Sequence, residues 1–188
     1  MTEIRNFLES MVPMSTSDWQ LFSERLKPVS VKKNEKLLEA GQVEDHIYFI
    51  SRGVVRLYIP RQENDITFGF VFSNEFVTAY DSFITKTPAA YSIETLADST
   101  LWKISYRDIQ EVYAKTQRGN LIGRKIAEQL FLLKSKRELS LLSKTAEDRY
   151  LDLFHERPQL FREIPLKYIA SYIGITPQAL SRIRKRIT

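Results

Sequence analysis

The sequence predicts an α+β protein in which an all-β barrel or roll is followed by helices. Three observations support this class. Short apolar stretches recur between residues 29 and 105 and are separated by Gly, Asn, Asp or Pro. From Arg107 onward, apolar residues recur instead at helical spacing. The last 24 residues then predict two short helices joined by a tight turn.

Strands are predicted where β-branched and aromatic residues gather between turn residues. Gly41 and Gly53 stand where turns would separate neighbouring strands. Before the strands, two short helices are predicted within residues 4–27, and the segment 15–18 offers several possible N-caps. The strands are expected at 29–32, 46–51, 54–59, 66–72, 91–96 and 100–104.

Composition restricts the function. The chain is 43% hydrophobic and 27% charged, which is ordinary for a globular protein with a core. The absence of cysteine excludes disulfides, thiolate nucleophiles and iron–sulfur clusters. With two distant histidines, His46 and His155, we predict neither a metal site nor a cofactor. We expect a cytoplasmic protein, because neither a membrane span nor a signal peptide is found in the sequence.

Charge is distributed unevenly along the chain. Residues 1–117 hold 13 Lys and Arg against 16 Asp and Glu, a net charge of −3. Residues 118–188 hold 15 against 7, a net charge of +8. Such an asymmetry is expected when only the second part binds a polyanion. A basic helical domain without that partner would have the same composition.

A long helix is predicted between Asn120 and Leu142, and a shorter one before it has Ser105 as its expected N-cap. Apolar residues lie on more than one side of the long helix, so it needs two packing partners. One is the roll of its own chain, and we expect the other to be a second copy. A central core helix of a monomer is the alternative. The predicted dimer contacts are Ile122, Ile126, Leu130 and Leu133.

The C-terminal segment predicts a helix-turn-helix. Pro165 suits the first turn of one helix, and Gly174 follows the last apolar position of that helix. Small Ala170 allows the two helices to cross closely. Thr176 can cap the second helix and Pro177 can open it. The alternative is an ordinary pair of helices with a solvated basic face.

The outward face of the second helix has the chemistry of a DNA reader. Glutamine can pair with adenine, arginine can bind guanine through two hydrogen bonds, and a helix N-terminus suits a phosphate. Further cations beside this face could reach the DNA backbone. The predicted DNA-binding residues are Thr176, Gln178, Ser181, Arg182, Lys185, Arg184 and Arg186.

Two stretches resemble the Crp–Fnr family of bacterial transcription regulators, namely HIYFISRGVVRLYI (46–59) and IPLKYIASYIGITPQALSRIRK (164–185). The resemblance extends over nearly the whole chain. It implies a double-stranded β-helix, a jelly-roll of the cyclic-nucleotide-binding type, at 1–117. It further implies a dimerisation helix at 118–143 and a winged-helix-like DNA-binding domain at 144–188. Gln178 and Arg182 fall where the family contacts bases, and Thr176 falls where it contacts phosphate.

Two features depart from the family pattern. The family's nucleotide cassette resembles Gly-Glu followed by Arg-Ser or Arg-Ala, but here 78–79 is Thr-Ala and 89–90 is Ala-Ala. A buried cyclic phosphate would lack its cation. We therefore expect the chain to belong to a short branch of the family that lacks the phosphate-binding arginine and does not bind cyclic AMP in the usual way. Lys86 is the alternative cation. Residues 155–165 are short for a β-hairpin wing, so the wing is expected to be reduced or absent.

The leading functional hypothesis is a homodimeric, sequence-specific regulator that binds a palindromic site in double-stranded DNA and acts with RNA polymerase. The alternative is a module that binds a small molecule, for example a cyclic-nucleotide-like one. In that case the contact of the module with DNA is weak or secondary. An enzyme is not expected, because the roll offers one histidine and no cysteine. The effector is unidentified, and packed core is the preferred interpretation of the aromatic roll interior. The tentative pocket residues are Phe70, Phe72, Tyr80, Tyr91 and Glu94.

Overall fold

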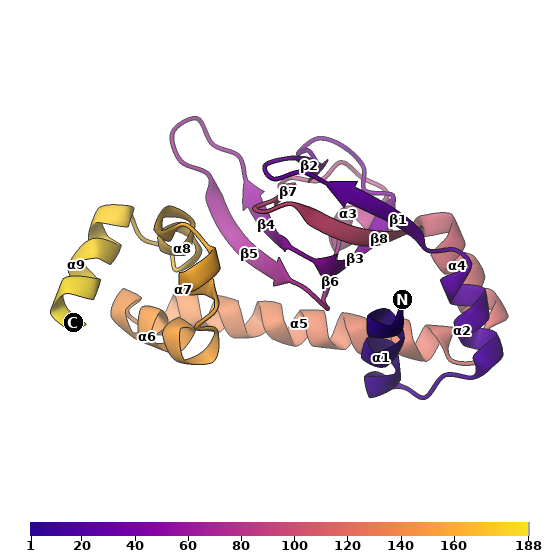
Figure 1. Ribbon diagram of the computed structural model, residues 1–188. Helices are drawn as coiled ribbons and strands as arrows, with labels where there is room; N and C mark the ends of the chain where they lie inside the picture. Colours follow the sequence, from indigo (N-terminus) through magenta and orange to yellow (C-terminus); the bar gives the residue numbers. More distant parts are fainter. Residues whose placement is uncertain (188) are drawn as a thin grey trace. The chain divides into compact units, whose positions relative to one another are not determined.

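The computed structural model describes residues 1–187 and confirms the α+β class (Figure 1). The chain divides into two compact units. The first unit consists of residues 1–57 and 70–129. The second consists of residues 58–69 and the chain from Leu130 onward. No helix within residues 1–187 is both long and apolar enough to cross a membrane.

The strands of residues 1–187 form two four-stranded sheets (Figure 1). They are β1 (Lys27–Val31), β2 (Lys36–Leu38), β3 (His46–Arg52), β4 (Val54–Ile59), β5 (Ile66–Phe72), β6 (Phe76–Val77), β7 (Ser92–Thr95) and β8 (Ser99–Ser105). The order is β1-β8-β3-β6 in one sheet and β2-β7-β4-β5 in the other. This is the strand order of a jelly roll, so the predicted roll is confirmed.

The interior of the roll comes from apolar residues on its central strands. Phe49 of β3 and Leu101 of β8 are completely buried, and β3 pairs with β8 in antiparallel register. Gly53 joins β3 to β4 with a φ of +123°, as expected of a turn glycine. A Cβ atom on Gly53 would lie 2.1 Å from Ser99 Oγ, so a larger residue does not fit there.

Three elements of the roll were not predicted from the sequence, β2, β6 and α3 (Tyr80–Thr85). β6 contributes only two residues, which pair with Tyr48 and Phe49 of β3. α3 has six residues and ends at Lys86, whose φ is +56°. Elements this short carry too few residues for a periodic pattern.

The remaining helices of the first unit form a core beside the roll. They are α1 (Thr2–Met11), α2 (Thr16–Ser23), α4 (Tyr106–Lys115) and the beginning of α5 (Gly119–Ser143). Phe7 of α1 packs edge-on against Phe76, with ring centroids 5.4 Å apart. Ser105 caps α4 by accepting the Asp108 N–H at 3.2 Å, which confirms the predicted cap. The core side chains include Ile4, Leu8, Ile109, Val112 and Ile122.

The second unit contains the end of α5 and the helices α6 (Ala146–Glu156), α7 (Leu160–Glu163), α8 (Leu166–Tyr172) and α9 (Pro177–Ile187). A capping box between Thr145 and Asp148 begins α6. The ring of Tyr150 packs edge-on against Phe161, with centroids 5.3 Å apart. Residues 155–165, where a reduced or absent wing was expected, contain α7 and no strand.

Candidate nucleic-acid interface and ligand site

The turn between α8 and α9 is fixed by backbone hydrogen bonds. The Gly174 N–H donates to Ser171 O at 3.1 Å, and the Ile175 N–H donates to Ala170 O at 3.0 Å. These two bonds form a Schellman motif, in which Gly174 adopts a φ of +79°. Thr176 Oγ1 then accepts the Ala179 N–H at 3.2 Å at the beginning of α9. The helix end and the new cap lie where the sequence predicted them.

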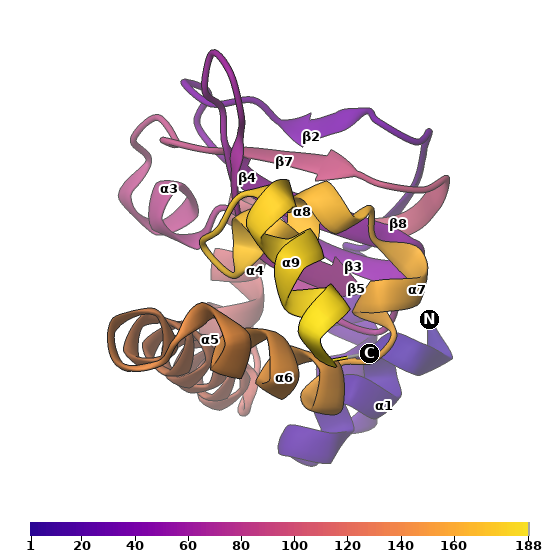
Figure 2. The same cartoon turned by 90° about the vertical axis from the view of Figure 1, so that its left-hand side faces the viewer.

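α8 and α9 follow one another across this turn (Figure 2). Each helix buries one side and exposes the other. Ile169 and Ala170 of α8 are fully buried, while Leu180 and Ile183 of α9 are 1% and 5% exposed. The opposite side of α9 is polar and accessible. All seven predicted DNA-binding residues are exposed, namely Thr176, Gln178, Ser181, Arg182, Arg184, Lys185 and Arg186.

The exposed side of α9 is strongly cationic and contains no carboxylate. Arg186 forms a surface ion pair with Glu147 of α6, with Nη2 and Oε2 2.7 Å apart. Ion pairs at such exposure contribute little stability, so a phosphate can replace the carboxylate. A depression of about 530 Å³ lies beside this face and is lined by Ala179, Arg182, Ile183, Lys185 and Arg186. The surface offers amide, hydroxyl and guanidinium groups together, which suits a polyanion.

Residues 58–69 contact α8 within the second unit. Ser171 Oγ accepts the Thr67 N–H and donates to Asp65 O, both at 2.9 Å. Lys134 Nζ lies 5.1 Å from the ring centroid of Phe68. The segment between β4 and β5 is therefore bonded directly to the first of the two C-terminal helices. No local pattern in the sequence indicated this contact.

The predicted dimer residues of α5 occupy different surroundings. Ile122 is buried in the core of the first unit, and Ile126 packs against that core. Leu130 is half-buried and Leu133 is 57% exposed. The stripe predicted for a second copy thus begins inside the chain's own core, because α1 and α4 cover its first turns.

Other apolar residues of α5 are the ones left uncovered. Phe131, Leu132, Leu139 and Leu142 are 70%, 65%, 61% and 78% exposed. At 3.6 residues per turn these four lie within a sector of about 100°. They lie outside the predicted stripe and form the larger exposed apolar face of α5.

Inside the roll, Arg56 of β4 and Glu94 of β7 form an ion pair, with Nη2 and Oε1 2.8 Å apart. Their side chains are 2% and 13% exposed. Glu94 was predicted as a pocket residue, but Arg56 was not singled out. A charged residue within the apolar strand VVRLYI was the available signal.

The other tentative pocket residues have several different surroundings. Phe70 is buried, while Phe72 and Tyr80 are half-buried. The Tyr91 hydroxyl donates to Asp81 Oδ1 of α3 at 2.5 Å. Burial and this carboxylate raise the pKa of Tyr91 well above its ordinary value. The Tyr91 hydroxyl thus bonds α3, whereas the Glu94 carboxylate pairs with β4.

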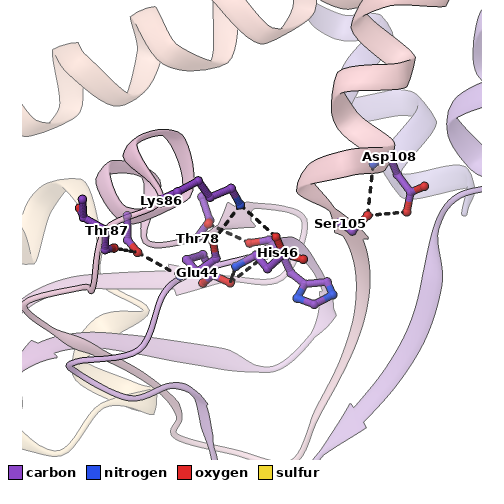
Figure 3. A network of polar contacts seen from close by, with 9 residues as sticks. Glu44, His46, Thr78, Lys86, Thr87, Ser105 and Asp108 are labelled. Carbon is purple, nitrogen blue, oxygen red and sulfur yellow. Dashed lines mark hydrogen bonds and ion pairs between the residues drawn. The ribbon is translucent and has the colours of Figure 1, made fainter.

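A polar network connects Glu44 with α3, which lies within the segment that corresponds to the family's nucleotide cassette (Figure 3). Glu44 is 2% exposed, and its Oε1 accepts the backbone N–H groups of Asp45 and His46 at 3.1 and 2.9 Å. The Glu44 N–H donates to Ser82 Oγ of α3 at 3.0 Å. Burial raises the pKa of Glu44 above its ordinary value, against the opposing effect of the backbone donors.

The cation considered for a cyclic phosphate is already engaged in this network (Figure 3). Lys86 Nζ donates to Asp45 Oδ1 at 2.9 Å and to Glu44 O at 3.3 Å. It also lies 3.8 Å from the ring centroid of Tyr106. Ala89 is 3% exposed, and its N–H donates to Gln42 O. These residues do not fit a cyclic phosphate, which requires a cation facing it and available N–H donors.

The roll can now be compared with known proteins. Residues 28–116, just under half of the chain, match the family model of the cyclic nucleotide-binding domain. The roll has the cyclic nucleotide-binding fold. No curated protein sequence matches the chain significantly.

Solved structures extend the likeness beyond this cyclic nucleotide-binding fold. The c-di-GMP-responsive global regulator CLP of Xanthomonas campestris has a TM-score of 0.73 at 17% identity, over 92% of this chain and 91% of that one. A Crp/Fnr-family regulator from Eubacterium rectale has a TM-score of 0.74 at 17% identity, over 96% and 87%. FixK2 of Bradyrhizobium japonicum has a TM-score of 0.71 at 16% identity, over 86% and 84%. At these identities the likeness shows a shared fold.

Proposed function

We propose that the protein is a sequence-specific DNA-binding transcription regulator that acts as a homodimer on a palindromic site. The observation that carries this proposal is the exposed cationic face of α9, whose opposite face is buried and which follows α8 after a tight turn. The fold shared with Crp/Fnr-type regulators over most of the chain supports it. A regulator of this kind would act in the cytoplasm together with RNA polymerase.

In this proposal α9 is the recognition helix and enters the major groove. Gln178 and Arg182 would contact base edges, since an amide suits adenine and a guanidinium suits guanine. Thr176 and the first N–H groups of α9 would contact a phosphate. Lys185 and Arg186 would bind the DNA backbone, with Arg186 exchanging Glu147 for a phosphate.

The second copy would pack along the exposed apolar face of α5, formed by Phe131, Leu132, Leu139 and Leu142. The spacing of Leu132 and Leu139 by seven residues suits a pair of parallel helices. A two-fold axis beside α5 would place two recognition helices in successive major grooves, about one helical turn apart. In this proposal these residues form the main dimer contact, in place of Ile122, Ile126, Leu130 and Leu133.

A small-molecule sensor is the second candidate function, supported by the cyclic nucleotide-binding domain match. Cyclic AMP in the usual pose is not expected, because Ala89 and Ala90 provide no cation and Lys86 is engaged. An effector of the roll would instead have to meet the buried pair Arg56 and Glu94. Phe70, Phe72, Tyr80 and Tyr91 remain proposed as its surroundings.

Fluorescence anisotropy with duplex DNA at two salt concentrations tests the DNA-binding proposal. Wild-type affinity should fall steeply as salt rises, because phosphate contacts release counterions. Arg182→Ala should weaken binding to a selected site by roughly 1–3 kcal/mol, whereas Arg107→Ala, at an 88% exposed arginine of α4, should not. Equal affinity of both variants would contradict the assignment of α9.

A further inference from the structure

A second pocket lies entirely within the second unit, between the end of α5, α6 and the end of α8. Its volume is about 490 Å³, within the range of small-molecule sites. Most of the exposed surface of its wall is apolar. The apolar lining residues are Leu132, Leu133, Leu139, Leu141, Leu153 and Ile173.

Two arginines of this pocket converge on the end of α8. Arg137 Nη2 donates to Tyr172 O at 3.0 Å. Arg149 Nε donates to Ile173 O at 2.8 Å, and its Nη1 donates to Lys144 O at 2.6 Å. All three acceptors are backbone carbonyls, so neither guanidinium is neutralised by these bonds.

Nearby acidic residues are already paired with other cations. Lys136 pairs with Glu156 at 2.8 Å, and Lys144 pairs with Asp152 at 2.6 Å. Among the ion pairs of residues 1–187, none joins Arg137 or Arg149 to a carboxylate. The pocket therefore keeps a local excess of positive charge beside an apolar wall.

The charge of Arg137 is only partly compensated. Its guanidinium carbon lies 4.9 Å from the ring centroid of Tyr172. The Arg137 Nε is buried and has no hydrogen-bond partner among the described residues. Burial lowers the pKa of Arg137 below its ordinary value and Arg149 lowers it further, while Tyr172 acts in the opposite direction. The carbonyl end of α8 offers only a partial negative charge to the two guanidiniums.

We propose that this pocket binds a small organic anion whose apolar body fills the leucine-lined part and whose carboxylate, sulfonate or phosphate group pairs with Arg137 and Arg149. The head group would add the full negative charge that the backbone carbonyls do not supply. Leu132 and Leu139 belong both to the pocket wall and to the proposed dimer face, whereas Phe131 and Leu142, the most exposed apolar residues of α5, do not line the pocket. A second copy would therefore border the pocket, and the anion would occupy the part beside Arg137 and Arg149.

The site has a consequence for DNA binding that rests on the proposed function. An anion at Arg137 and Arg149 competes with the carbonyls of Tyr172 and Ile173, directly before the turn at Gly174. The orientation of α9 after this turn would then depend on occupancy. Ligand binding itself can be measured without DNA, so failure of one proposal does not imply failure of the other.

The test is a fluorescence titration of the full chain with anilinonaphthalene sulfonate, compared with N-phenylnaphthylamine, which lacks the sulfonate. The anion should bind at one site per chain and at least about tenfold more tightly than the neutral analogue. Arg137→Gln and Arg149→Gln should each weaken the anion about tenfold and leave the neutral analogue unchanged. Arg162→Gln, at an exposed arginine of α7 outside the pocket, should change neither.

A pocket-filling variant keeps the test valid if an arginine variant does not fold. Ser140 lines the pocket, so Ser140→Phe should abolish anion binding while both arginines remain. Equal binding of both probes, or unchanged anion affinity in Ser140→Phe and in the folded arginine variants, would overturn the proposal. A change of oligomeric mass in Arg137→Gln without a change in probe binding would also overturn it, and would assign the pocket to a second copy.

Discussion

Arg56 Nη2 lies 2.8 Å from Glu94 Oε1, and this pair joins the neighbouring strands β4 and β7 inside the roll. Both side chains are removed from water, so each charge depends on the other. The pair is thus a structural element of the roll and the polar group that an effector entering it would meet.

Glu94→Ala is expected to destabilise the protein by roughly 3–5 kcal/mol, because it leaves the Arg56 charge buried without its carboxylate. Urea denaturation measures this change. The double variant Arg56→Met with Glu94→Leu should recover most of the lost stability, since apolar residues of similar size replace the pair. Asp98→Asn, which breaks the exposed pair with Lys32, should have little effect. Equal loss in the single and double variants would contradict the account.

Leu142→Glu and Phe131→Glu are expected to convert the proposed dimer to a monomer, because each places a charge on the exposed apolar face of α5. Sedimentation equilibrium measures the mass. Gln129→Glu adds the same charge at an exposed position on another side of the helix and should leave the dimer intact. A monomeric wild-type protein would contradict the proposed role of this face.

Glu44 predicts a component of the pH dependence of stability. Its pKa is raised by burial above the ordinary 4.5, so the folded state binds its proton more tightly than the unfolded state does. This contribution is fully present below pH 4.5 and is lost as pH rises through the folded pKa. Wild type should therefore gain stability relative to Glu44→Gln as pH falls toward 4.5. Parallel urea-denaturation curves at each pH would show that Glu44 does not titrate in this way.

Ser171→Ala is expected to release the segment 58–69 from α8, because the hydroxyl accepts from Thr67 and donates to Asp65. Each lost bond contributes about 0.5–1.5 kcal/mol. Hydrogen exchange should become faster at the Thr67 amide. Ser143→Ala, whose hydroxyl only bonds Leu139 O on the same helix, is the matched control. Unchanged exchange at Thr67 in Ser171→Ala would rule out the coupling.

Local signals in the sequence were sufficient for the turn elements. Gly174, Thr176 and Pro177 each have one strong conformational preference, so the end of α8 and the start of α9 could be predicted. Gly53 and the alternating strands around it likewise gave β3 and β4. These features depend on residues within a few positions of one another.

Long-range contacts could not be obtained in this way. Ser171 meets Thr67 across 104 positions, and nothing local to either residue specifies the other. The exposed apolar face of α5 could not be located from the sequence for the same reason. Burial of Ile122 depends on contacts with α1 and α4 rather than on periodicity. The pairing of Arg56 with Glu94 likewise depends on the sheet order, which places β4 beside β7.

Selection of bound duplexes from a random-sequence pool, by the purified full chain at two salt concentrations, tests whether α9 recognises a DNA sequence. A dimeric regulator should enrich a palindrome whose half-sites lie about one helical turn apart. Arg182→Ala should lose preference at one base pair of each half-site. Salt-sensitive binding without any enriched sequence would contradict the account, because α9 would then be a nonspecific cationic surface.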